Sequence, residues 1–126
     1  MISFSIIGGA GFRAQYFLRI AQALPEQFHV CGMVVRNEQT GKKLEQKWNV
    51  ATYRNVEQLL EKESPQFIVV SVSGQASPGY LLQLGELGIP ALAETPPAPT
   101  IEELVTLHEK LTCMGAKIQV AEQYHL

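Results

Sequence analysis

The sequence contains few cysteines, and their placement excludes two kinds of protein. Cys31 and Cys113 are the only two, and they form no Cys-x-x-Cys pair, so neither a disulfide framework nor a thiolate metal site is expected. The three histidines do not cluster, and His29 and His108 are expected to have structural roles. We therefore expect no bound metal, and we expect both thiols to be reduced and packed inside a cytoplasmic protein.

Long apolar runs and a strong net charge are also missing. The longest apolar runs, such as residues 67–72, are far shorter than the roughly 20 residues of a membrane-spanning helix. The amino terminus has no basic segment followed by a cleavage site, so no secretory signal is expected. A formal net charge of −2 gives no electrostatic footprint for nucleic acid or for an anionic membrane. The 126 residues, 46% of them hydrophobic, fit one soluble domain with its own core.

What the chain does contain is a regular alternation of β-rich runs and helical stretches, which predicts βαβ units and a parallel sheet. Strands are expected at residues 2–8, 28–35, 50–53, 67–72, 91–94 and 117–121. Helices are expected at residues 13–24 and 37–48, after Asn55, and at residues 78–88 and 100–114. Right-handed crossovers would give about six strands in the order 3-2-1-4-5-6 with helices on both faces, which is the doubly wound Rossmann arrangement of the α/β class.

Three residues are predicted to cap helices at their amino ends. They are Asn37, Asn55 and Thr100, whose short polar side chains can accept a hydrogen bond from a free backbone N–H. Gln58 and Glu103 stand three residues after two of these caps, which is the spacing of a capping box.

The hydrophobic pattern also predicts which side chains are buried. The first helix should bury a face made of Phe17, Ile20, Ala21 and Leu24. Gly41 should weaken the second helix by about 1 kcal/mol. The wider core is expected to include Ile6, Ile7, Val34, Ile68, Val70 and Val120.

A glycine-rich turn between the first strand and the first helix is the main functional motif. Gly9-Ala10-Gly11-Phe12-Arg13-Ala14 matches the pattern G-x-G-x-x-G/A in the structural context where that pattern binds a dinucleotide. One glycine permits the tight turn, the next lets the backbone approach a pyrophosphate, and the small third residue lets the helix pack closely on the sheet. The free amides of the helix would then hold the negative charge.

Each of these six residues is a candidate for the cofactor site. Arg13 can contact a phosphate or stay solvated, and Phe12 fits a packing role better than a cofactor contact. The alternative interpretation is that the glycines only reverse the chain.

The end of the second predicted strand indicates which nicotinamide cofactor is bound. In NAD-binding domains an acidic residue there accepts hydrogen bonds from the adenosine ribose, but this sequence has Val34-Val35-Arg36-Asn37 and no carboxylate. Arg36 can pair with a 2′-phosphate and stack on adenine. The sequence therefore favours NADP(H) over NAD(H), with Arg36 and Asn37 as candidate contacts; the alternative is that Arg36 simply faces solvent.

These motifs, together with residues 67–96 and the closing residues 119–125, resemble the glucose–fructose oxidoreductase / inositol dehydrogenase (Gfo/Idh/MocA) family over the entire chain. The resemblance implies an NAD(P)-dependent oxidoreductase of two domains that acts on sugars, inositols and related hydroxyl compounds. It implies that the cofactor crosses the carboxyl ends of the strands, with candidate contacts from Ser73, Gly74 and Glu94; the alternative for the loop at residues 73–77 is an ordinary turn, which small polar residues also form. Its second domain would bind the substrate and commonly also makes the oligomer, so the state of assembly stays open.

Two departures from the family pattern bear on catalysis. The family's Glu-Lys-Pro motif is Glu94-Thr95-Pro96 here, and a threonine hydroxyl cannot replace the ammonium of a lysine. No catalytic residue is therefore assigned, although His125 follows the last strand near the expected cofactor edge. The chain also stops at Leu126, where the second domain is expected to begin. Residues 1–126 are therefore predicted to be the cofactor domain alone, which would bind a small-molecule substrate only with the missing domain and be inactive by itself.

Three functions stay open from the sequence. The parent protein can be an oxidoreductase, or a non-catalytic nucleotide-binding or sensing module that lacks the family lysine. A flavodoxin-like protein for another nucleotide is the third, and its sheet would have the order 2-1-3-4-5.

Overall fold

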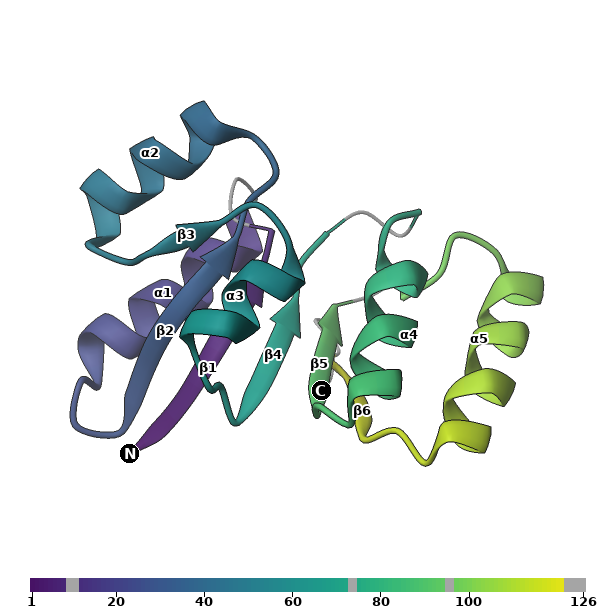
Figure 1. Ribbon diagram of the computed structural model, residues 1–126. Helices are drawn as coiled ribbons and strands as arrows, with labels where there is room; N and C mark the ends of the chain where they lie inside the picture. Colours follow the sequence, from purple (N-terminus) through teal and green to yellow (C-terminus); the bar gives the residue numbers. More distant parts are fainter. Residues whose placement is uncertain (9–11, 73–74, 95–96, 122–126) are drawn as a thin grey trace.

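The sheet has the strand order that the sequence predicts. A computed structural model describes residues 1–8, 12–72, 75–94 and 97–121, without the side chains of Phe12, Arg13 and Ala121. It contains a parallel six-stranded sheet of order β3-β2-β1-β4-β5-β6 (Figure 1). This order confirms the Rossmann arrangement and excludes the flavodoxin-like order.

The elements alternate strictly along the chain. The strands are β1 (Ile2–Ile7), β2 (Phe28–Val34), β3 (Thr52–Tyr53), β4 (Phe67–Val70), β5 (Ala91–Glu94) and β6 (Ile118–Ala121). The helices are α1 (Phe12–Ala23), α2 (Glu38–Trp48), α3 (Val56–Lys62), α4 (Ser77–Leu87) and α5 (Ile101–Met114). Each predicted element is present, and the largest differences are that β3 and β4 are two residues shorter than predicted.

All three predicted N-caps are confirmed. The side-chain oxygens of Asn37, Asn55 and Thr100 accept hydrogen bonds from the third backbone N–H that follows, at 3.0, 2.8 and 3.1 Å. The capping box predicted for Gln58 is displaced by one residue, because its side chain accepts from the N–H of Arg54, not of Asn55.

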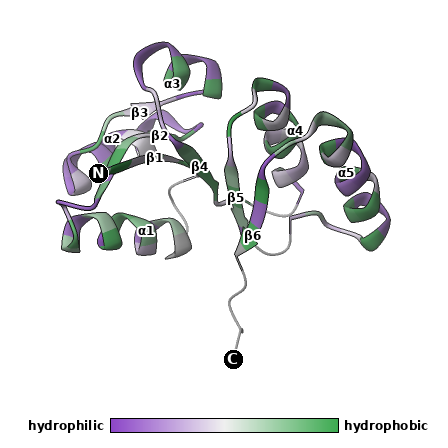
Figure 2. Ribbon diagram, turned by 90° about the horizontal axis from the view of Figure 1, so that it is seen from below, coloured by the Kyte–Doolittle hydropathy of each residue, from purple (hydrophilic) through white to green (hydrophobic). Residues whose placement is uncertain are grey.

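Two apolar layers cover the two faces of the sheet. Figure 2 shows α1 on one side of the sheet and α3, α4 and α5 on the other. The α1 side also receives Leu44 of α2, and it is made of Phe4, Ile6, Ala14, Leu18, Met33, Val35, Leu44, Val50 and Val69. The other side gathers Ile7, Val34, Ile68 and Val70 beneath side chains of α3, α4 and α5. None of the helices among the described residues has the length and apolar character needed to cross a membrane.

Two of the predicted buried side chains are exposed instead. Val120 keeps 41% of its surface exposed, because β6 is the edge strand and has a neighbour on one side only. Leu24 is 42% exposed because α1 ends at Ala23, so the buried face of that helix is centred on Ala14 and Leu18. Five of the predicted residues are buried, namely Ile6, Ile7, Val34, Ile68 and Val70, and three residues of α1 are partly buried, namely Phe17, Ile20 and Ala21.

The two cysteines lie in different surroundings. The Cys31 sulfur is half-buried, 3.2 Å from the Ser5 hydroxyl and 3.5 Å from the carbonyl oxygen of Phe4. Burial raises the pKa of the Cys31 thiol, and the negative charge of Glu63 raises it further. Cys113 is exposed on α5, so the prediction that both thiols are packed is wrong for Cys113, which lies on the solvent face of an amphipathic helix.

Candidate cofactor site

The carboxyl ends of the strands meet at one edge of the sheet because all six strands are parallel. Gly8 follows β1 there, Arg36 follows β2, and Ser71 follows β4 (Figure 1). In a doubly wound sheet this edge, at the point where the strand order reverses between β1 and β4, is where ligands bind. The fold therefore brings the predicted glycine turn and the predicted arginine to the same edge.

The turn after β1 depends on Gly8. Its φ angle is +92°, and its N–H donates to the carbonyl oxygen of Val34 at 2.8 Å, which continues the β1–β2 ladder. A Cβ atom at this position would lie 2.1 Å from the carbonyl oxygen of Ser71, so no side chain fits. The chain leaves β1 in a conformation that only glycine adopts readily.

On the far side of the turn, Ala14 is fully buried in α1 against the sheet. A small residue at this point lets the helix lie close to the strands. Gly9, Ala10 and Gly11 lie outside the described residues, as do the side chains of Phe12 and Arg13.

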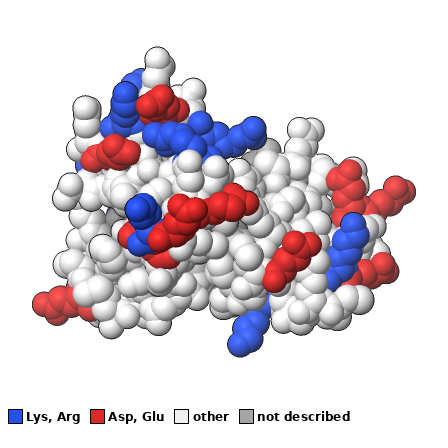
Figure 3. Space-filling model, viewed as in Figure 1, with Lys and Arg blue, Asp and Glu red and all other residues white. Residues whose placement is uncertain are grey.

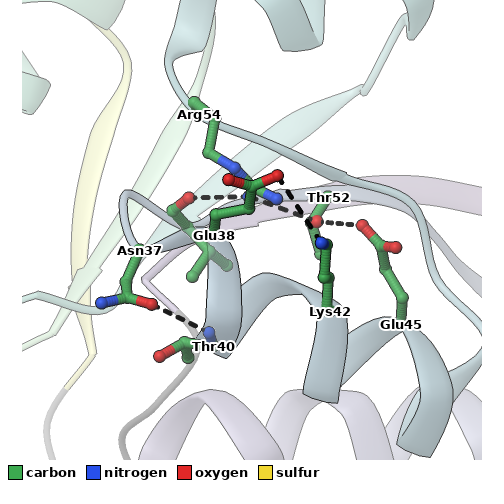
Figure 4. Close-up of polar contacts among 8 residues, drawn as sticks. Asn37, Glu38, Thr40, Lys42, Glu45, Thr52 and Arg54 are labelled. Carbon is green, nitrogen blue, oxygen red and sulfur yellow. Dashed lines mark hydrogen bonds and ion pairs between the residues drawn. The ribbon is translucent and has the colours of Figure 1, made fainter.

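Val34, the last residue of β2, and the three residues that follow it form the β2 tip, residues 34–37. Val34 and Val35 are buried, whereas Arg36 and Asn37 are exposed. The Asn37 side chain is already used as the cap of α2, because its Oδ1 accepts from the N–H of Thr40. The first acidic residue after the tip is Glu38, and it forms an ion pair with Lys42 at 3.8 Å (Figure 4).

A second arginine, Arg54, also reaches the β2 tip, and no pattern in the sequence predicts it. It follows β3 directly, and its Nη1 donates to the carbonyl oxygen of Val35 at 3.0 Å and to Thr52 Oγ1 at 3.4 Å (Figure 4). Thr52 in turn donates to the carboxylate of Glu45. An arginine after a two-residue strand carries no motif, so only its tertiary contact reveals it.

A tertiary contact explains why residue 41 of α2 is a glycine, which helix propensity alone does not explain. A Cβ atom at Gly41 would lie 2.5 Å from Nη1 and 2.8 Å from Nη2 of Arg54. The glycine in the interior of α2 therefore leaves the space that the guanidinium occupies. Lys and Arg side chains gather on this face over α2 and the connection after β3 (Figure 3).

The ends of β4 and β5 are joined by a polar contact. The Ser71 hydroxyl donates to Oε2 of Glu94 at 3.0 Å, which orients the predicted cofactor residue Glu94. Nearby, α4 begins at Ser77, whose buried hydroxyl has no hydrogen-bond partner within the described segments. Ser73, Gly74, Thr95 and His125 lie outside the described residues.

The remaining titratable residues form no second centre in the part of the chain that the structure describes. Within it, no group of three His, Cys, Asp or Glu side chains could hold a metal ion. His29 and His108 are both exposed, on β2 and on α5. Burial raises the pKa of the Tyr53 hydroxyl, and the charge of Glu63 adds to this effect.

Fold and sequence together define a nicotinamide-dinucleotide-binding domain of the Rossmann type. The sequence matches the family model described as "Oxidoreductase family, NAD-binding Rossmann fold" over residues 2–122. The chain thus belongs to the Gfo/Idh/MocA oxidoreductase family. Among curated protein sequences, none matches it.

Solved structures with the same fold are distant in sequence. The WlbA dehydrogenase from Bordetella pertussis, solved with NADH and UDP-GlcNAcA, is 14% identical with a TM-score of 0.84 over 97% of this chain and 37% of that one. The myo-inositol 2-dehydrogenase from Lactobacillus plantarum is 14% identical with a TM-score of 0.79, over 95% of this chain and 36% of that one.

A third similar structure was solved with a different pair of bound molecules. It is the biliverdin reductase from Synechocystis sp. PCC 6803, solved with biliverdin and NADP+, which is 15% identical with a TM-score of 0.78 over 94% of this chain and 37% of that one. This chain spans a little over one third of the length of each of these three proteins.

Proposed function

We propose that this chain is the NADP(H)-binding domain of an oxidoreductase that transfers hydride between the nicotinamide and a sugar, polyol or similar hydroxyl or carbonyl compound. The family match supports a nicotinamide dinucleotide as the ligand. The observation that carries the preference for NADP(H) is the β2 tip, where an exposed Arg36 follows two buried valines and no carboxylate stands at residues 34–37. A guanidinium there attracts a 2′-phosphate and offers nothing that accepts a ribose hydroxyl.

The proposed contacts follow the edge of the sheet. In this proposal the glycine turn, residues 9–14, binds the pyrophosphate at the start of α1. Arg36 binds the 2′-phosphate, and the Nδ2 group of Asn37, whose Oδ1 caps α2, contacts the adenosine ribose. Ser73 and Gly74 are the contacts that we propose for the nicotinamide side, as the family resemblance implies. Glu94, oriented by the Ser71 hydroxyl, is a further contact there. When bound, the cofactor supplies or accepts the hydride.

The proton that accompanies the hydride needs a separate acid–base group. Thr95 stands where the family carries a lysine, and its hydroxyl does not titrate near neutral pH. We propose that the group comes from His125 or from a further domain that also holds the substrate, because hydride transfer requires donor and acceptor in near-attack geometry. The same threonine supports the second candidate function, a non-catalytic module that binds or senses the nucleotide.

Replacing Arg36 tests the proposed cofactor preference. Arg36→Ala should weaken NADPH binding by roughly tenfold or more, because a charge-assisted hydrogen bond of about 1.5–3 kcal/mol is lost. NADH affinity should change little, since NADH has no 2′-phosphate. Isothermal titration of both cofactors measures the two effects.

Arg19→Ala is the matched control, because Arg19 is an exposed arginine of α1 and its loss changes the net charge equally. It should leave both affinities unchanged. Equal losses of NADPH and NADH affinity in Arg36→Ala would contradict the assignment of Arg36 to the 2′-phosphate.

A further inference from the structure

Two arginines extend from neighbouring strand ends at the adenosine side of the site. β2 and β3 pair in parallel with Val34 opposite Tyr53, and the N–H of Val35 donates to the carbonyl oxygen of Tyr53 at 2.8 Å. Arg54 and Arg36 therefore each leave the sheet at the carboxyl end of adjacent strands. The Arg54 guanidinium is tied to the β2 tip by its hydrogen bond to Val35 (Figure 4).

The space for the Arg54 guanidinium depends on Gly41, a residue that lowers the stability of α2. Glycine in a helix interior destabilises a helix by roughly 0.5–1 kcal/mol relative to alanine. Alanine at Gly41 would place its methyl group 2.5 Å from Nη1 of Arg54. The residue that destabilises α2 is thus the one that leaves space for the guanidinium of Arg54.

Among the described residues, Arg54 forms hydrogen bonds only with neutral groups. Its acceptors are the Val35 carbonyl and the Thr52 hydroxyl. Of the nearest acidic residues on α2, Glu38 pairs with Lys42 and Glu45 accepts from Thr52. Within the described residues no carboxylate pairs with Arg54 or Arg36. Two like charges at adjacent strand ends repel each other unless an anion lies between them.

We propose that Arg54 is a specificity-determining residue that binds the 2′-phosphate of NADP(H) together with Arg36. This inference rests on the proposed function. A guanidinium has five donors, and only Nη1 of Arg54 is used by the described residues, so its remaining N–H groups can bind a phosphate in the bidentate manner. The pyrophosphate belongs at the β1 turn, which leaves the 2′-phosphate as the dianion at the ends of β2 and β3.

The test compares ligands that differ only in the 2′-phosphate. We expect Arg54→Gln to raise the Kd of NADPH and of 2′,5′-ADP about tenfold, while the Kd of NADH and of 5′-AMP changes less than about twofold. Gly41→Ala leaves Arg54 in the chain but displaces its guanidinium, so it should give the same selective loss. Arg19→Gln is the control for charge, and thermal unfolding reports the stability of each variant.

The outcomes separate this inference from the proposed function. Equal losses of affinity for NADPH and NADH, with a lowered unfolding temperature, would show that Arg54 only stabilises the packing of β3 against α2. This result would overturn the inference. Tight NADPH binding that Arg54→Gln and Gly41→Ala leave unchanged would overturn it too, with the proposed function intact. An unaltered chain that binds neither cofactor would overturn both. If Arg54→Gln does not fold, Gly41→Ala and Arg54→Lys decide, because a lysine keeps the charge but cannot form the bidentate contact.

Discussion

Replacing Gly8 with alanine should destabilise the folded chain by about 3–5 kcal/mol. A positive φ angle costs a residue with a side chain about 1–3 kcal/mol, and overpacking adds a similar amount. Gly8 has a φ of +92°, and the obstacle is the backbone carbonyl of Ser71, which β4 holds in place and which cannot rotate away as a side chain would. Because a domain of this size is stable by roughly 5–15 kcal/mol, this loss should remove a large fraction of the free energy of unfolding.

Denaturant unfolding followed by circular dichroism measures this loss. Gly79→Ala is the matched control, since a Cβ at Gly79 of α4 meets nothing within 4 Å. Alanine there should leave the stability unchanged or raise it by up to about 1 kcal/mol. A Gly8→Ala variant that unfolds at the same denaturant concentration as the parent would show that the turn after β1 is not held as described.

Replacing Gly11 with valine should abolish dinucleotide binding while the domain stays folded. In the G-x-G-x-x-G/A pattern this glycine lets the backbone approach the pyrophosphate, so the added isopropyl group would occupy the space of the ligand. Both NADPH and NADH should be affected, by roughly a hundredfold or more, because the loss concerns the part that they share. Titration of each cofactor, alongside the far-ultraviolet circular dichroism spectrum, measures the effect.

The control for Gly11→Val is Ala23→Val, which enlarges the exposed last residue of α1, at the end of that helix away from the glycine turn. It should bind both cofactors like the parent. Retained binding in a folded Gly11→Val variant would contradict the assignment of the pyrophosphate to this turn and favour glycines that serve only to reverse the chain.

The sequence predicts best those features that depend on short-range patterns. Asn37, Asn55 and Thr100 cap their helices as expected, because a cap needs only its own side chain and the next turn of backbone. The strand order follows from the handedness of short crossovers, which leaves few topologies for such an alternating chain. The G-x-G-x-x-G/A motif at residues 9–14, which indicates a dinucleotide-binding domain, is a short-range pattern of the same kind.

The features that the sequence does not reveal depend on which residues meet across the fold. Val120 is as apolar as a core residue, and only its place on the edge strand leaves it exposed. From the sequence alone, Gly41 only lowers the stability of α2. Its role becomes apparent once the β2–β3 pairing brings Arg54, thirteen residues later in the chain, next to it. The contact between Ser71 and Glu94 likewise joins two strand ends that no spacing rule connects.

Direct titration of the unaltered chain with NADPH and NADH tests the central claim, that this is a nicotinamide-dinucleotide domain whose β2 tip selects the 2′-phosphate. FMN and ATP serve as unrelated nucleotides in the same experiment. We expect saturable binding of NADPH with a Kd roughly tenfold or more below that of NADH, and weaker binding of FMN and ATP. A chain that binds NADH as tightly as NADPH, or FMN or ATP more tightly than either, would contradict the account.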